Sequence, residues 1–280
     1  MLASLAFFNQ DFHPIDAVGV PLLDRGWLYG DLLLETIRIE KGIPLFWQDH
    51  LARMLSGARL FGLPIAPLQK NARILRQKLP HLTKPHILRI TYTRGISSTG
   101  MCPSLRGTPA FFATLQETTP WKQRPKLVCS VLSVCRRPVP EYCPFTCKHG
   151  QYLASVLALQ QAKKQGATEV IWQDHKGHLA ETSSGNLFLF QGRNLVTPPD
   201  DGCILAGITR KYVMQLATEI GCKVKEKKIT KRMLFSADAV FRTSSIQGLV
   251  GIKQVDQRST FSSPARFYQL HQAFVEIGSK

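Results

Sequence analysis

The rest of the chain is organised around Cys147-Lys148-His149-Gly150-Gln151-Tyr152-Leu153, a segment that leads into an amphipathic helical pattern. Apolar residues stand on both sides of Lys148, so we expect its ammonium to lie beside apolar surface. A lysine in such a place loses its proton more easily, and the neutral amine is the form that makes a Schiff base with an aldehyde. The competing interpretation is a solvated surface lysine.

A glutamate follows in a loop of small residues. Glu181 precedes Thr182-Ser183-Ser184-Gly185, a loop too small and flexible to be there for packing. A lysine and a glutamate on different elements predict two groups that converge on one ligand, as an aldehyde cofactor would need. The alternative is an exposed loop glutamate.

Length and charge limit the class of protein. The chain has 280 residues, enough for one large or two medium domains. Its formal net charge of +17 raises the question of nucleic acid as a partner. The basic residues are spread along the chain and lie in no nucleic-acid-binding motif. We therefore expect no nucleic-acid partner, but a solvated basic face that helps to attract small anionic substrates.

The apolar runs and the cysteines indicate the compartment. No apolar run reaches membrane-spanning length, and Met1 to Phe8 is short and lacks a basic leader, so we expect a first strand and not a signal peptide. The seven cysteines form no CxxC pair and no ligand pattern with histidine. This usage predicts a cytoplasmic protein with no membrane association and no metal site.

The first part of the chain alternates strands and helices. Leu32 to Ile39 alternates as a half-buried strand, and Lys41-Gly42 predicts a hairpin turn. Helical spacing predicts a helix from Asp49, its N-cap, to Phe61, and a second helix covers Leu68 to Leu79. Two strands then follow, at 87–94 and 110–115. In the charged loop before the first strand, Asp24 and Arg25 could simply brace the loop.

A polar, proline-bearing stretch is the best linker in the chain. It predicts a smaller N-terminal domain at 1–118, a linker at 119–125 and a larger C-terminal domain at 126–280 that carries Lys148. In the larger domain we expect a helix over Tyr152–Gln165 that ends at Gly166. Two hairpins follow, one with its turn at 174–177 and one with its turn near Gln191-Gly192.

A second helix of this domain begins with Gly207-Ile208-Thr209-Arg210. The amides of Ile208 and Thr209 stand at its start, where the helix dipole and unpaired N–H groups favour a phosphate. Thr243-Ser244-Ser245 follows a strand and supplies hydroxyls for the same anion. The sequence thus predicts an anion site in the larger domain.

In this order, the segments resemble the fold-type IV pyridoxal-phosphate family, the class IV aminotransferases. The resemblance runs from about residue 15 to 256. It depends on the following motifs: Asp24-Arg25-Gly26, Tyr29-Gly30-Asp31, Glu35-Thr36-Ile37-Arg38, His50-Leu51-Ala52-Arg53, Lys148, Glu181 to Asn186, Gly207-Ile208-Thr209-Arg210 and Thr243-Ser244-Ser245.

The resemblance implies a two-domain α+β fold, similar to D-amino-acid aminotransferases, with pyridoxal 5'-phosphate between the domains. Lys148 would bind the cofactor covalently and carry the proton, while Glu181 would face the pyridine nitrogen. Family members are usually homodimers. The residues implied to complete the cofactor site are Arg53, Leu205, Gly207, Ile208, Thr209, Ser244 and Ser245.

The same resemblance suggests residues for the substrate. Tyr29, Glu35 and Arg38 would line the substrate side, with Arg94 as a further candidate. Thr36 would place a catalytic hydroxyl near the reacting carbon.

Aminodeoxychorismate lyases are the closest in pattern, with release of pyruvate and p-aminobenzoate for folate biosynthesis. The compact length, the strand Glu35-Thr36-Ile37-Arg38 and Lys148-His149 favour this reaction. The Arg-x-His carboxylate trap of D-amino-acid aminotransferases also has no counterpart between Gly95 and Pro103. Transamination of branched-chain or D-amino acids is the alternative, and a non-catalytic basic binding protein is the third possibility.

Overall fold

The computed structural model describes residues 4–97, 100–103, 107–136, 147–262 and 264–278. They divide into two compact units. Unit 1 comprises Met1–Pro120 and Cys147–Gln151, and unit 2 comprises Trp121–Thr146 and Tyr152–Lys280. The first boundary, at Pro120, falls inside the predicted linker. The second differs from the prediction, because the residues around Lys148 belong to unit 1.

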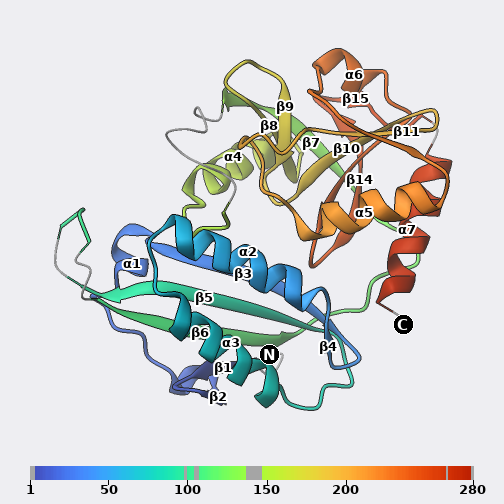
Figure 1. The fold of residues 1–280 in the computed structure, drawn as a ribbon. Helices are drawn as coiled ribbons and strands as arrows, with labels where there is room; N and C mark the ends of the chain where they lie inside the picture. Colours follow the sequence, from blue (N-terminus) through green and yellow to red (C-terminus); the bar gives the residue numbers. More distant parts are fainter. Residues whose placement is uncertain (1–3, 98–99, 104–106, 137–146, 263, 279–280) are drawn as a thin grey trace. The chain divides into compact units, whose positions relative to one another are not determined.

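Unit 1 is an antiparallel sheet in the order β2-β1-β6-β5-β3-β4 (Figure 1). Its strands are β1 (Ser4–Phe8), β2 (Asp11–Pro14), β3 (Leu32–Glu40), β4 (Ile43–Pro44), β5 (His86–Ile96) and β6 (Thr108–Glu117). Its helices are η1 (Ile15–Ala17), α1 (Arg25–Tyr29), α2 (Trp47–Leu60) and α3 (Ile65–Lys78).

One face of this sheet forms the core of unit 1 with α2 and α3. The alternation of β3 turns Leu33, Ile37 and Ile39 toward this core, where they join Met54 of α2 and Leu68 of α3. The hairpin turn at Lys41-Gly42 is confirmed. Hydrophobic periodicity therefore predicted the interior of unit 1.

The start of α2 differs from the prediction. The helix begins at Trp47 after Phe46, whose φ of 54° is left-handed and whose own side chain makes no capping hydrogen bond. Asp49 lies inside the first turn, so its predicted role as N-cap is wrong. A carboxylate there can still interact favourably with the helix dipole.

The lysine segment joins unit 1 through β3. Lys148 O accepts a hydrogen bond from Leu34 N at 2.8 Å, and His149 forms an antiparallel bridge with Leu33. Cys147 is buried in the core of the unit. A Cβ on Gly150 would lie 2.8 Å from Leu32 Cδ1, so a glycine permits the close approach.

Unit 2 is built on a sheet whose main path is β12-β11-β10-β13-β14-β7-β8-β9 (Figure 1). Its strands are β7 (Lys126–Arg136), β8 (Glu169–Gln173), β9 (Leu179–Thr182), β10 (Asn186–Gln191), β11 (Asn194–Thr197), β12 (Lys223–Glu226), β13 (Ala239–Ser244), β14 (Gly248–Val255) and β15 (Arg258–Ser259). Its helices are α4 (Leu153–Lys164), α5 (Ile208–Glu219), α6 (Lys231–Phe235) and α7 (Ala265–Ile277).

The sheet of unit 2 closes on itself, because β9 also pairs with β10. The strands β10, β13, β14, β7, β8 and β9 thus form a ring, and one core cluster takes residues from all of them. A second cluster packs α5 and α7 against β10 and β13. The ring closes where Glu181 of β9 pairs with Asn186 of β10, on the two sides of the loop that the sequence predicts to be functional.

The predicted helices and hairpins of unit 2 are confirmed. The helix predicted over Tyr152–Gln165 is α4, and Gly166 follows it with a left-handed φ of 73°. Both hairpins are present, as β8–β9 and β10–β11. None of the described helices is long and apolar enough to cross a membrane.

Candidate functional site

Sheet register in unit 2 lines up three polar residues that belong to the motifs named above. Asn186 at the start of β10 pairs with Glu181 of β9 on one side and with Thr243 of β13 on the other. The three side chains therefore come from neighbouring strands at the point where the ring closes. All three residues are buried, at 7% exposure for Glu181, 4% for Asn186 and 1% for Thr243.

The carboxylate of Glu181 is held in one orientation by amides. Its Oε2 accepts hydrogen bonds from Leu205 N at 3.1 Å and from Asn186 Nδ2 at 3.2 Å. Asn186 Nδ2 also donates to Leu205 O at 2.7 Å. These contacts bind the end of β9 to the segment that precedes α5, so a predicted cofactor residue, Leu205, has its backbone fixed beside Glu181.

The start of α5 is available for an anion. Its N-cap is Gly207, which has no side chain to cap the first turn, and the first N–H groups of a helix lack partners within it. A Cβ on Gly207 would lie 1.9 Å from Asn186 Oδ1, so only glycine fits against Asn186. Ile208 and Thr209 begin the helix and are buried. Uncapped amides and the helix dipole favour a phosphate here.

Hydroxyl groups lie at the end of β13. Thr243 Oγ1 is buried and has no hydrogen-bond partner among the described residues. Ser244 Oγ accepts a hydrogen bond from Gln247 N at 3.3 Å, and Ser245 lies in the turn after β13. Since α5 packs against β13, the predicted phosphate residues of both elements lie in one region of unit 2.

Lys148 lies in unit 1 as a half-buried residue, five positions before α4 begins. It therefore does not head the helix itself. Its backbone is fixed on β3, while the hydrogen bond from Gln151 N to His149 Nδ1 at 3.2 Å stabilises the turn that follows. The structure thus gives Lys148 a rigid support that the sequence pattern did not indicate.

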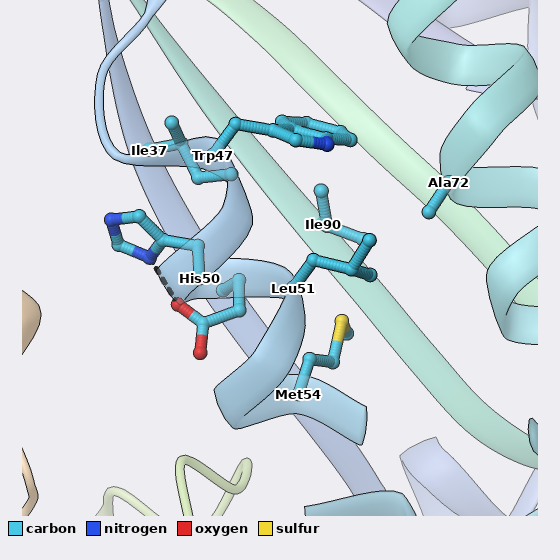
Figure 2. A pocket seen from close by; sticks show the side chains of 8 residues that line it. Ile37, Trp47, His50, Leu51, Met54, Ala72 and Ile90 are labelled. Carbon is cyan, nitrogen blue, oxygen red and sulfur yellow. Dashed lines mark hydrogen bonds and ion pairs between the residues drawn. The ribbon is translucent and has the colours of Figure 1, made fainter. Parts of the chain in front are cut away.

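Arg53 and Glu35 form a bidentate ion pair in unit 1, between α2 and β3. Arg53 donates through Nε at 2.8 Å and through Nη2 at 2.7 Å, and His50 Nδ1 donates to the same carboxylate at 2.6 Å. Figure 2 shows His50, Trp47 and Met54, which together with Glu35 line a cavity of ≈ 10 Å³. A cavity of that size accommodates at most about one water molecule.

This cluster corrects the prediction for Glu35. The residue is 1% exposed and turns to the core side of β3, so it does not line a substrate site. Burial alone would raise the pKa of Glu35, but the charge of Arg53 and the hydrogen bonds from His50 and Arg53 lower it to about 2. Glu35 is therefore an ionised structural partner, which sequence spacing alone could not show.

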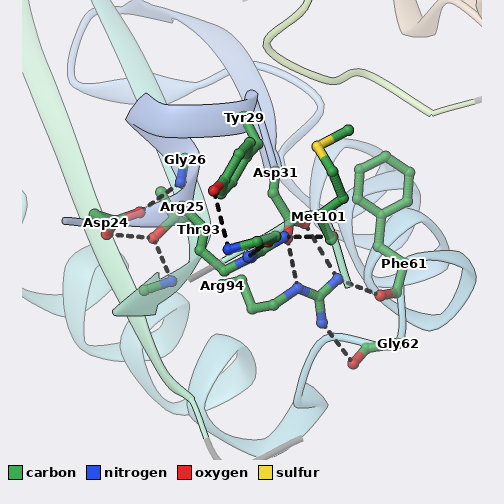
Figure 3. Close-up of polar contacts among 12 residues, drawn as sticks. Asp24, Arg25, Gly26, Tyr29, Asp31, Phe61, Gly62, Thr93, Arg94 and Met101 are labelled. Atoms are coloured by element: carbon green, nitrogen blue, oxygen red, sulfur yellow. Dashed lines mark hydrogen bonds and ion pairs between the residues drawn. The ribbon is translucent and has the colours of Figure 1, made fainter. Parts of the chain in front are cut away.

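The other predicted substrate residues take part in contacts within unit 1. Figure 3 shows Arg94, which donates to Asp31 through Nε at 2.6 Å and to the Phe61 carbonyl at 2.7 Å. Tyr29 Oη accepts a hydrogen bond from Gly100 N at 3.2 Å. These two side chains connect α1, β5 and the loop that follows β5.

Asp24 and Arg25 brace this region, which is the structural alternative that the sequence left open (Figure 3). Asp24 accepts hydrogen bonds from Gly26 N and Thr93 Oγ1, both at 2.7 Å. Arg25 pairs with Asp31 at 3.1 Å and donates to the carbonyls of Gly100 and Met101.

Arg38 and Thr36 occupy the face of β3 opposite to Glu35. Arg38 is 2% exposed; its Nε donates to Glu40 at 2.5 Å and its Nη2 to the Thr119 carbonyl at 2.7 Å. These contacts are those of a structural arginine. Thr36 is half-buried and pairs in register with Arg89 of β5.

The groups of unit 2 fit pyridoxal phosphate. The uncapped start of α5 and the unpartnered Thr243 hydroxyl suit a phosphate ester, and the oriented Glu181 carboxylate suits a protonated pyridine nitrogen.

Asn186 is the residue missed in the predicted site. Its place in the motif with Glu181 was visible, but its contacts with Leu205 and Gly207 were not.

Comparison with known proteins gives the family. The family described as amino-transferase class IV matches residues 32–255. A protein of Methanocaldococcus jannaschii named "Putative branched-chain-amino-acid aminotransferase" is 33% identical over 90% of this chain and 88% of its own length. The branched-chain-amino-acid aminotransferase of Escherichia coli is 26% identical over 91% of this chain and 85% of its own.

A solved structure has the same fold. An aminotransferase from Brucella abortus, described as bound to the cofactor PLP, superimposes with a TM-score of 0.89 at 23% identity and covers 99% of this chain and 100% of that chain. This likeness confirms the predicted fold class. With the family match over most of its length, the chain belongs to the class IV aminotransferase family and takes pyridoxal phosphate as its cofactor.

Proposed function

We propose that this protein is an aminotransferase that takes branched-chain amino acids as amino donors. The observation that carries the proposal is the similarity, over nine tenths of the chain, to relatives named for branched-chain transamination. The lyase reaction, which the sequence pattern favoured, is less well supported because these relatives are named for the alternative. A second reason concerns the two arginines proposed to bind an anionic substrate: Arg38 and Arg94 are both paired with carboxylates of the protein.

Each proposed site residue has a distinct task. Lys148 would hold the cofactor covalently until the amine of the substrate replaces its Nζ, and the freed Nζ would then move the proton to and from the substrate carbon that bears the amino group. Pyridoxal phosphate supplies the electron sink for negative charge at that carbon. Glu181 holds the proton on the pyridine nitrogen. The phosphate is bound by Arg53 and by groups of Gly207, Ile208, Thr209, Ser244 and Ser245, while Leu205 fixes the carboxylate of Glu181.

Thr36 and Tyr29 remain proposals for the substrate side of the site. A hydroxyl from Thr36 would orient the substrate, and Tyr29 would shape the pocket from the loop that its hydroxyl supports. The predicted homodimer is likewise part of the proposal, and sedimentation of the purified protein tests it.

A paired assay tests the reaction type. The purified protein with bound cofactor is incubated with leucine, isoleucine or valine and 2-oxoglutarate, and separately with aminodeoxychorismate. We expect glutamate to form in the first assay. Formation of p-aminobenzoate and pyruvate without transamination would replace the proposal with the lyase reaction.

A second experiment tests Lys148 itself. Borohydride should attach the cofactor covalently to Lys148, as peptide mass spectrometry would detect. Lys148→Ala should lose about 10²–10⁴ in turnover, the range typical of a positioned acid–base group, and should bind the cofactor only reversibly. Lys122→Ala is the matched control in the other unit. A colourless protein that does not bind added pyridoxal phosphate would contradict the family assignment of the site.

A further inference from the structure

A buried ion pair lies behind the candidate cofactor site of unit 2. Arg242 Nε of β13 is 2.6 Å from Glu169 Oε2 at the start of β8, and the two side chains are 7% and 2% exposed. The Nε–H group does not point at the oxygen as a hydrogen bond requires, so the contact is an ion pair. Burial lowers the pKa of Arg242, and the charge of Glu169 opposes that shift. None of the tasks proposed above uses this pair.

Glu169 binds the loop that follows Glu181. Its Oε1 accepts hydrogen bonds from Ser183 N at 3.0 Å and from the Ser183 hydroxyl. Its Oε2 accepts from Ser184 Oγ at 2.9 Å. A carboxylate that accepts several hydrogen bonds from one short loop fixes the conformation of that loop.

Arg242 binds the turn that carries the proposed phosphate hydroxyls. Its Nη2 donates to the side-chain oxygen of Gln247, and its Nη1 lies 3.5 Å from Ser244 Oγ. Arg242 directly precedes Thr243, whose register partner is Asn186. The guanidinium therefore connects the turn after β13 with Glu169.

We propose that Glu169 and Arg242 act together as a positioning pair for the cofactor. Through Glu169 the pair orders the loop after Glu181, and so positions the carboxylate that is proposed to face the pyridine nitrogen. Through Arg242 it orders the turn that carries Ser244, whose hydroxyl is proposed to bind the phosphate. The proposal rests on the proposed function of these two segments. An ion pair suits this task, because charged partners make stronger hydrogen bonds than neutral groups and neighbouring bonds polarise one another. The pair therefore strengthens both the hydrogen bonds of Glu169 to its loop and those of Arg242 to its turn.

Cofactor affinity of the separate variants tests the pair. Pyridoxal phosphate is titrated into the apoprotein of the parent, Glu169→Gln, Arg242→Met and the double variant, and absorbance follows binding. Each single variant should raise the Kd at least about tenfold, the loss typical of a charged hydrogen-bond partner. The double variant should be little worse than either single one, because residues that act as one unit are not additive. The ³¹P resonance of the bound phosphate should also move in Arg242→Met.

A conservative variant covers the case in which the charged variants do not fold. Ser184→Ala removes one exposed hydroxyl that donates to Glu169, so the protein should fold normally. We expect its Kd to rise about two- to tenfold. Leu270→Ala in the core of α7 is the control for stability, because Leu270 is a fully buried member of the cluster that packs α5 and α7 against β10 and β13 and makes no hydrogen bond through its side chain. Its melting temperature should fall while its Kd stays at the parent value.

The outcomes separate a positioning role from a structural one. If Glu169→Gln, Arg242→Met and Ser184→Ala all keep the parent Kd and ³¹P resonance while the first two melt earlier, the pair serves only stability and the proposal is overturned. If the increases in Kd of the two single variants multiply in the double variant, Glu169 and Arg242 act independently, and the proposed coupling is overturned. A parent protein that fails to bind pyridoxal phosphate at Lys148 would instead contradict the proposed function.

Discussion

Two buried glutamates, one in each unit, are held by different partners. Glu35 of unit 1 is 1% exposed and accepts hydrogen bonds from the guanidinium of Arg53 and the imidazole of His50. Glu181 of unit 2 is 7% exposed and accepts from the amides of Asn186 and Leu205. A guanidinium beside a carboxylate stabilises its ionised form, and the amides of Asn186 and Leu205 fix the direction of the Glu181 carboxylate.

The difference supports a structural role for Glu35 and the proposed cofactor role for Glu181. Glu35 lies among core residues of β3 and α2, where a charge persists only with an opposite charge beside it. Glu181 lies where the ring of unit 2 closes, next to the uncapped start of α5. Substitutions at the two positions should therefore change different measured quantities.

The largest expected effect is the loss of stability in Glu35→Gln. Removal of the carboxylate charge leaves the Arg53 guanidinium without its partner, and breaking a buried pair costs about 3–5 kcal/mol in the free energy of unfolding. Chemical denaturation measures the loss. Glu117→Gln is the control, because its partner Lys84 is 66% exposed and surface pairs contribute about 0–1 kcal/mol. Equal losses at both positions would contradict the structural role of Glu35.

Acid should remove the same stabilisation from the parent protein. The folded-state pKa of Glu35, about 2, lies below the ordinary value of 4.5, so its ionisation stabilises the fold above that value. The contribution, about 3 kcal/mol, is lost as the pH falls from about 4.5 to 2. Denaturation at several pH values should show a steeper loss in the parent than in Glu35→Gln. Parallel curves would show that another group causes the acid sensitivity.

Glu181→Gln should change catalysis and leave stability nearly unchanged. Glutamine keeps the shape of the side chain but cannot hold the proton of the pyridine nitrogen by charge. The benefit of that proton belongs mainly to the transition state, so turnover should fall by about 100-fold while cofactor content stays near normal. Steady-state kinetics and absorbance measure the two quantities. Glu219→Gln, at the exposed end of α5, is the control. Parent-like turnover of Glu181→Gln would show that the carboxylate does not face the ring.

The smallest expected effect is on cofactor affinity and concerns Arg53, which pairs with Glu35 and is also proposed to bind the phosphate. Because Arg53→Ala breaks the buried pair, it should lose stability as Glu35→Gln does, and its affinity is measured where the variant is folded. Arg53→Ala should weaken cofactor affinity at least about tenfold. Titration of the apoprotein with pyridoxal phosphate measures the affinity. Arg59→Ala, an exposed arginine on the same helix, should leave it unchanged. Unchanged affinity in Arg53→Ala would leave Arg53 with its structural role alone.

Tertiary contacts decided roles that local patterns left open. Glu35 and Arg53 are 18 positions apart, and their pairing depends on how α2 packs on β3. Glu169 and Arg242 meet only because β8 and β13 belong to the same closed ring. Their own neighbours in the sequence indicate nothing of these partners. The lysine segment belongs to unit 1 for the same reason, since Leu34 bonds to Lys148 across a long sequence distance.

The family, the fold class and most helices and hairpins could be predicted from the amino-acid sequence. These follow from periodicity, turn residues and short motifs, which depend on neighbours along the chain. The sequence also marked the segment of Glu181 and the start of α5. The tertiary structure was needed to show that Glu35 is an ionised side chain in the core of unit 1. It was also needed to show that Asn186 donates a hydrogen bond to Glu181 and packs against Gly207. The physical reason is that burial and the partners of a charge are set by segments far apart in the sequence.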